Sequence, residues 1–103
     1  MKVYKPNDEG WLCGYWNGSP IQIKYSDDRP LKDEGLHIHN SREYYLMVEG
    51  KLTLKVDGKE QTISELELIM IEPGEPHKII KKSKKCKYVI VKEKSEKYNK
   101  KMV

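Results

Sequence analysis

The stretch that decides the fold is His37-Ile38-His39-Asn40-Ser41-Arg42-Glu43, which is followed by Gly50 and, further along, by His77. It holds two of the chain's three histidines, and His77 is the third. His37 and His39 stand at positions i and i+2, so on a β-strand both imidazoles lie on the same face. His77 follows the turn-forming residues 73–76, which can bring a second strand back beside the first. Three imidazoles and one carboxylate suit a divalent transition metal.

Short apolar runs separated by turn signals surround this stretch. Asn17-Gly18 and Asp57-Gly58 are tight-turn pairs, and helical periodicity is almost absent. This pattern predicts an all-β sandwich or barrel. The strands are expected at residues 21–25, 44–48, 52–56, 61–63, 68–71, 77–80 and 86–91. We expect one domain over residues 1–103, with a core at about 20–92 and a charged tail at 93–103 that frays or forms a short helix.

The bulk composition points to a small soluble protein. Of the 103 residues, 37% are hydrophobic and 35% are charged, which makes a lean core. A bound metal or a partner subunit would therefore add to its stability. No apolar run is long enough for a membrane span, and the first residues lack the apolar stretch of a signal peptide. Cys13 and Cys86 lie far apart and form no CxxC pair, so we expect reduced, packed thiols in a cytoplasmic protein.

The positive charge is concentrated in the last quarter of the chain. Residues 78–103 carry eleven lysines and two glutamates. The densest group is Lys78, Lys81, Lys82, Lys84, Lys85 and Lys87. Such a cluster could meet an anionic partner, but it has no arginine for base contacts and only Tyr88 for stacking. We favour a solvated loop and an edge strand whose lysines discourage aggregation, and we expect no nucleic-acid partner.

The spacing of the four candidate ligands fits a rigid site built from several strands. His37 and His39 would be about 7 Å apart at their Cα atoms, twice the rise of a strand. Glu43 shares their odd parity, so it returns to the same interior if the next strand pairs alongside. His77 would complete the set from a second hairpin. Four ligands on an octahedral ion such as Fe, Mn or Ni leave two positions open.

This pattern resembles the two motifs of the cupin family. The first motif matches at His37, His39, Glu43 and Gly50, and the second matches in part at Gly74 and His77. The departures are Leu31, Leu66 and Glu72, which replace two glycines and a proline, and Lys81, which replaces an asparagine. The resemblance covers residues 20–92 and implies a small jelly-roll-like barrel, the double-stranded β-helix, with a metal held by the four side chains.

The resemblance leaves the activity and the metal open. Cupins include dioxygenases, isomerases, decarboxylases and lyases, so a metal-dependent enzyme acting on a small molecule is our first hypothesis. A barrel that binds or senses a small ligand, such as a sugar, is the second, and an interaction protein that uses the lysine cluster is a weaker third. Ligand chemistry alone does not choose among Fe, Mn, Ni, Zn and Cu.

Two further groups of residues are candidates for a ligand site. Tyr45 and Met47 share the parity of Glu43, so we expect them to face the same interior and to contact a substrate. Trp11, Tyr15 and Trp16 could stack on a ligand ring at the barrel mouth. Because the chain has no phenylalanine, we favour a place for these three in the core or in a dimer interface.

The strand at residues 44–48 is apolar on both faces, so both must be covered. Either the opposite sheet or a second subunit would cover Tyr44, Leu46 and Val48. Because small cupins often pair as dimers, the resemblance favours a homodimer.

Overall fold

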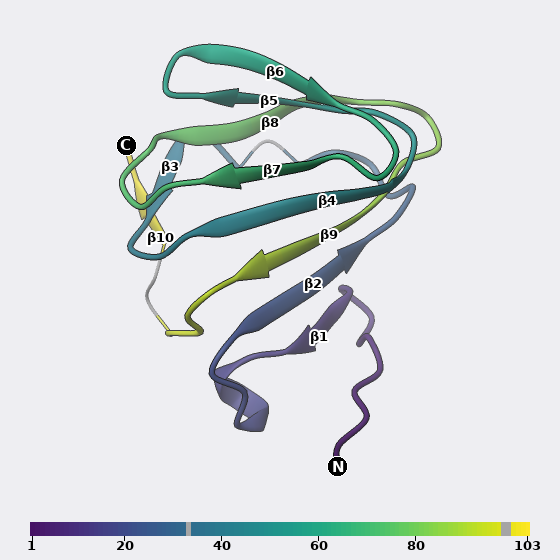
Figure 1. Ribbon diagram of the computed structural model, residues 1–103, viewed down its shortest axis with the longest axis vertical. Helices are drawn as coiled ribbons and strands as arrows, with labels where there is room; N and C mark the ends of the chain where they lie inside the picture. Colours follow the sequence, from purple (N-terminus) through teal and green to yellow (C-terminus); the bar gives the residue numbers. More distant parts are fainter. Residues whose placement is uncertain (33, 98–99) are drawn as a thin grey trace.

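The computed structural model describes residues 1–32, 34–97 and 100–103, and its strands form two antiparallel five-stranded sheets (Figure 1). One sheet has the order β1 (Trp11–Cys13), β2 (Gln22–Ser26), β9 (Lys87–Lys92), β4 (Glu43–Glu49) and β7 (Leu68–Ile71). The other has the order β10 (Lys100–Met102), β3 (His37–His39), β8 (His77–Lys82), β5 (Leu52–Val56) and β6 (Lys59–Ile63). The predicted all-β fold is confirmed, and β5 and β7 have the expected bounds.

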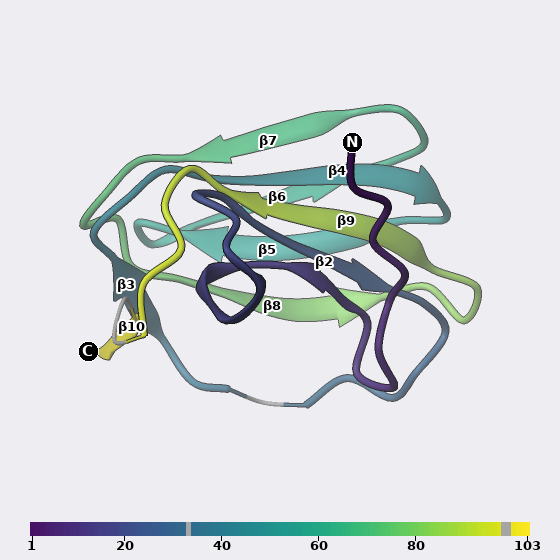
Figure 2. The same cartoon turned by 90° about the horizontal axis from the view of Figure 1, so that it is seen from below.

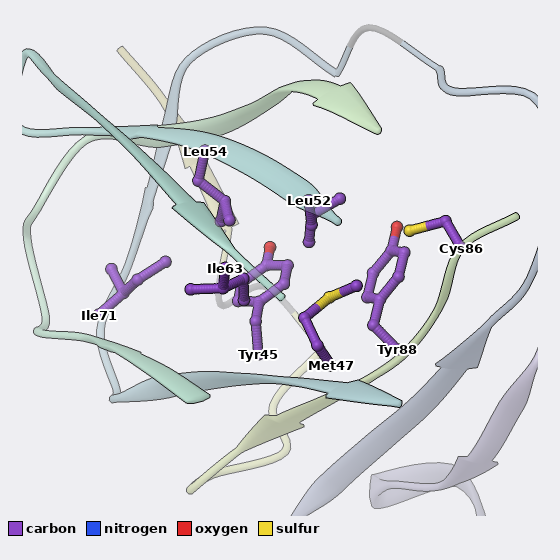
Figure 3. Close-up of a cluster of buried hydrophobic side chains, with 8 residues drawn as sticks. All are labelled: Tyr45, Met47, Leu52, Leu54, Ile63, Ile71, Cys86 and Tyr88. Atoms are coloured by element: carbon purple, nitrogen blue, oxygen red, sulfur yellow. The ribbon is translucent and has the colours of Figure 1, made fainter. Parts of the chain in front are cut away.

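The hydrophobic core lies between the two sheets. Figure 3 shows Tyr45 and Met47 projecting from β4 toward Leu52 and Leu54 of β5. The whole cluster consists of Tyr45, Met47, Leu52, Leu54, Ile63, Ile71, Cys86 and Tyr88. Burying one leucine, isoleucine or methionine side chain of this cluster stabilises the fold by about 1.5–3 kcal/mol. The rings of Tyr45 and Tyr88 stack with their centres 6.2 Å apart, so tyrosines fill the bulky positions in a chain without phenylalanine.

The aromatic residues near the N-terminus are not in this core. Trp11 begins β1, and Tyr15 and Trp16 belong to the 3-10 turn η1 (Tyr15–Asn17). Tyr15 is 48% exposed and Trp16 is 46% exposed. The core position is therefore wrong for Tyr15 and Trp16, because the turn places them outside the sheets, and their place in a dimer interface stays a prediction. η1 is also the only helical element among the described residues, and none of these residues forms a helix that could cross a membrane.

The stretch after residue 92, which was predicted as a frayed tail or a short helix, contains a strand. Its residues 100–102 form β10, which pairs antiparallel with β3. Lys100 lies opposite His39, and Met102 lies opposite His37. The other side of β3 has one paired position with β8, so β10 supplies most of the partners of the histidine strand. Figure 2 shows β3 and β10 together at one end of the molecule.

The face of β4 that points away from the core stays open. Leu46 is 36% exposed and Val48 is 46% exposed, because the second sheet packs only on the side of Tyr45 and Met47. Strand β7 pairs with β4 and continues this apolar face with Leu68, which lies opposite Leu46. Of the two expected covers, the opposite sheet is therefore excluded for Leu46 and Val48, and a second subunit stays a prediction.

Candidate metal centre

Three strands bring the four predicted ligands together. His37 and His39 lie on β3, Glu43 begins β4 and His77 begins β8. All four side chains are buried, and His37 is the residue of β3 that pairs directly with His77. The alternation of β3 turns both of its histidines inward, as the i, i+2 spacing predicts.

The three imidazoles form one compact group. One ring nitrogen from each histidine can be chosen so that all three lie within 4.8 Å of one another. Backbone carbonyls fix two of the rings, since Nδ1 of His37 donates to Gly35 O at 2.9 Å and Nδ1 of His77 donates to Glu75 O at 2.9 Å. With the proton held on Nδ1, Nε2 of each ring presents a lone pair to the interior, which is how metal-binding histidines are oriented.

Glu43 faces two of these rings. Its Oε1 lies 3.3 Å from Nε2 of His77, and its Oε2 lies 3.1 Å from Nε2 of His39. Within the described chain, His77 Nε2, Glu43 Oε2 and His39 Nδ1 are buried without a hydrogen-bond partner. At His77, whose Nδ1 donates to a backbone carbonyl, the neutral ring presents only a lone pair to Glu43 Oε1, so a cation between these two acceptors would satisfy both. The residues therefore fit a metal ion.

The protonation states also suit a cation. Burial lowers the pKa of His39 to about 4 and also lowers the pKa of His37, so both rings are neutral at pH 7. Burial alone would raise the pKa of Glu43, but His77, His39 and Lys92 together lower it to about 2. Neutral imidazoles and an ionised carboxylate are the forms that bind metal.

A cavity of about 200 Å³ opens beside this group. His37, His39, Glu43 and Tyr45 contribute to its wall. Burial, and then the Glu43 carboxylate, raises the pKa of Tyr45 well above its ordinary value, so its hydroxyl keeps its proton. Met47, which was predicted beside it, is fully buried in the core cluster and is not among the residues that line this cavity.

Sequence reasoning missed four polar residues that line the same cavity. Gln22, Lys24, Lys92 and Lys100 also line the cavity, and Nζ of Lys92 lies 3.7 Å from Oε2 of Glu43. The alternation of residues 21–25 correctly predicted a half-buried strand, but its polar side faces the cavity and Ile21 is exposed. Lys92 lies an even number of residues after the core residue Tyr88, so the two side chains share one face of the strand. This spacing was the sequence signal that Lys92 points inward.

The lysine cluster does not form one surface. Lys78 and Lys82 line a second cavity of about 180 Å³, which shares His37 and Tyr45 with the first. Nζ of Lys82 donates to Asp27 O at 3.0 Å, and Nζ of Lys87 lies 3.4 Å from Oε2 of Glu49. The group that looked continuous in the sequence is therefore divided between the interior and the surface.

The comparisons with known proteins agree with this architecture. Residues 29–92 match the model of the cupin domain. A cupin family protein with a double-stranded β-helix fold from Methanocaldococcus jannaschii is similar in structure, with a TM-score of 0.75, 16% identity and 92% of each chain covered. No curated protein matches the sequence of the chain.

Two further structures are similar over most of this chain. Oxalate decarboxylase from Bacillus subtilis has a TM-score of 0.69 and 14% identity over 99% of this chain, which spans 30% of that protein. A putative ethanolamine utilization protein Q from Salmonella typhimurium has a TM-score of 0.63 and 13% identity over 90% of this chain and 80% of its own. These identities show a shared fold alone, whereas the domain model covers more than half of the sequence. The chain belongs to the cupin family.

Proposed function

We propose that His37, His39, Glu43 and His77 hold a divalent transition metal, and that the protein is a metal-dependent enzyme acting on a small molecule in the adjoining cavity. The observation that carries the proposal is the 3.3 Å approach of Glu43 Oε1 to His77 Nε2. The other nitrogen of His77 is bonded to a backbone carbonyl, so two acceptors face each other in a buried site. A metal ion resolves this arrangement.

The chain's own residues would prepare the site in three ways. The carbonyls of residues 35 and 75 hold the rings of His37 and His77 in one orientation. Glu43 supplies the negative charge, and Tyr45 presents a protonated hydroxyl at the cavity wall. A bound ion would supply Lewis-acid or redox chemistry at the inner end of the cavity. These features support a dioxygenase, isomerase or lyase without choosing among them.

The test is elemental analysis of untagged protein, comparing the wild type with His39→Ala and with Arg42→Gln. Arg42 is next to Glu43 in sequence but lies exposed on the outer face, where it contacts Glu72, so it is a matched control. We expect one equivalent of Fe, Mn, Ni, Zn or Cu in the wild type and in Arg42→Gln. His39→Ala should lose at least tenfold in metal affinity.

The outcome separates the two main functions. Loss of metal in His39→Ala but not in Arg42→Gln would support the metal centre. Turnover by the wild type that requires the metal would then support the enzyme. Metal without turnover would favour a barrel that binds a small ligand, with the ion in a structural role. If the wild type takes up no metal even after incubation with each ion, the proposed centre is wrong.

A further inference from the structure

A groove of about 410 Å³ adjoins the metal cavity. Its lining includes Trp11, Tyr15, Trp16, Gln22, Lys92 and Lys100, and one carboxylate, that of Glu96. Four of these residues, Trp11, Gln22, Lys92 and Lys100, also line the inner cavity, so the two spaces share a wall. A molecule that lies in the groove therefore reaches the residues beside the candidate metal centre.

The aromatic side chains of the groove are held in place by packing and by hydrogen bonds. The rings of Trp11 and Trp16 meet edge to face with their centres 5.6 Å apart, and those of Tyr15 and Trp16 do so at 5.3 Å. The Trp16 ring lies over Gly14, where a Cβ atom would overlap it. Three hydrogen bonds hold the turn: Gly14 N–H to Asn17 Oδ1 at 2.9 Å, Asn17 Nδ2 to Leu12 O at 3.2 Å and Tyr15 N–H to Ser95 Oγ at 2.7 Å.

The exposure of these rings needs an explanation. Tyr15 and Trp16 are each nearly half exposed, although hydrogen bonds hold the turn that carries them. Large aromatic side chains held open at a cavity mouth are typical of surfaces that receive a flat, apolar group.

The wall shared by the two spaces is positively charged. Lys92 and Lys100 are part of this wall and line both spaces. Lys24 lines the inner cavity, and its Nζ lies 4.8 Å from the centre of the Trp11 ring. Lys100 contacts Glu34 at 3.1 Å, but both side chains are more than a third exposed, and such surface pairs are weak. Lys92 has Glu43 as its partner, and that carboxylate is a proposed metal ligand. A ligand carboxylate would find cationic groups here.

We infer that the substrate is a small carboxylate with a flat apolar body, which binds with its ring on Trp16 and Tyr15 and its carboxylate beside Lys92 and Lys100. The inference deepens the proposed function, because it rests on the metal cavity as the inner end of the site. It follows from the juxtaposition of an exposed aromatic shelf with the half-buried Lys92 and the exposed Lys100 on a wall common to both spaces.

Trp11 and Trp16 are the two tryptophans of the chain, so tryptophan emission reports directly on the groove. The probes are phenylacetate, its neutral analogue phenylacetamide and acetate, titrated into protein with and without Mn²⁺. We expect phenylacetate to change the emission and to bind about tenfold more tightly than either of the others. Equal affinity for phenylacetamide, equal affinity for acetate, or no binding of phenylacetate would overturn the inference.

Variants assign the two halves of the groove. Trp16→Leu keeps Trp11 as the fluorescent reporter, and Tyr15→Leu keeps both tryptophans. Each substitution should weaken the binding of phenylacetate about threefold or more. Lys100→Gln should weaken phenylacetate about threefold but leave phenylacetamide unchanged. Lys101→Gln is the matched control, since this exposed neighbour in β10 lines neither space. Unchanged phenylacetate affinity in both aromatic variants, or equal losses in the two lysine variants, would contradict the assignment.

Metal content, measured by equilibrium dialysis on the same samples, keeps the two proposals separate. Binding of phenylacetate without uptake of metal would refute the metal centre and leave the groove as a carboxylate site. Uptake of metal with no selective binding of phenylacetate would refute the groove alone.

Discussion

His77 lies directly across from His37 in the pairing of β8 with β3, and their imidazole centres are 4.4 Å apart. This is the one paired position recorded between the two strands among the described residues. Two candidate ligands thus make the one pairing between the sheet's histidine-bearing strands among the described residues. Strand pairing and the site are therefore coupled, and changes at the site are expected to affect the stability of the fold.

The metal-free protein should lose stability as the pH falls from about 6.5 to 4. Burial lowers the pKa of His39 from 6.5 to about 4, so in this range the unfolded chain binds a proton that the folded chain does not. The free energy of unfolding must then decrease as the pH falls, by about 1.4 kcal/mol for each unit of pKa difference. The burial of His37 acts in the same direction. Urea unfolding with a chelator at pH 8, 6 and 4.5 measures the effect.

His39→Gln is the control for this dependence, because it removes one of the two titrating groups and should reduce the pH dependence between pH 6.5 and 4 to the part that His37 contributes. The contribution of Glu43, whose pKa is lowered to about 2, is present above pH 4.5 and is lost as the pH falls below that value. A wild type whose stability stays constant from pH 8 to pH 4.5 would contradict the burial of neutral histidines.

Leu66→Gly should stabilise the protein by about 1 kcal/mol. Leu66 has a φ of +63°, a left-handed conformation that costs a residue with a Cβ about 1–2 kcal/mol. Its side chain is 82% exposed, so little packing is lost, although glycine also gains freedom in the unfolded chain. Leu66→Ala keeps the strained backbone and is the matched control. Thermal unfolding should rank Leu66→Gly above both the wild type and Leu66→Ala, and the reverse order would show that the position carries no strain.

The two motif glycines should respond differently to alanine. At Gly50, with φ at +88°, a Cβ would overlap the carbonyl oxygen of Lys85 and the hydroxyl of Ser83. At Gly74, with φ at +82°, a Cβ would meet open space. We expect Gly50→Ala to cost about 3 kcal/mol or more, from strain and overlap together, and Gly74→Ala to cost about 1 kcal/mol. Chemical denaturation of the pair would detect the difference, and equal costs would refute the close approach at Gly50.

The homodimer remains a prediction, and the open face of β4 and β7 gives it a location. Leu46, Val48, Leu68 and Met70 are exposed there, although apolar patches on monomers are usually small. Leu68→Glu should convert a dimer to a monomer in light scattering. Gln61→Glu, which adds a charge at an exposed position of β6 in the other sheet, should not. A wild type that is monomeric at all concentrations would exclude the dimer.

The sequence was sufficient for features that depend on local spacing. The i, i+2 histidines, the parity of Glu43 and the Asp57-Gly58 turn, with φ values of +49° and +81°, all follow from rules that act within a few residues. The faces of β4 also alternate as its parity predicts, with Tyr45 and Met47 buried and Leu46 and Val48 exposed.

Features that depend on distant partners could not be read in this way. Nothing within residues 93–103 indicates a strand, because β10 forms only against β3. Lys92 resembles a solvated surface lysine by type, and although its spacing from Tyr88 indicates the inward face, only the pairing of β9 with β4 shows that it lies beside Glu43. Tyr15 and Trp16 look like core residues by type, and only the turn at Gly14 explains why they lie outside.

The pairing of β10 with β3 also sets an order of events during synthesis. His37 and His39 leave the ribosome long before residues 100–102, so the nascent chain carries its histidine strand with an open edge. Until β10 arrives, that strand has a single paired position to hold it. A metal ion that bound earlier would be held by a strand that is still free to move. Stable metal binding is therefore expected only after residue 102 has left the ribosome.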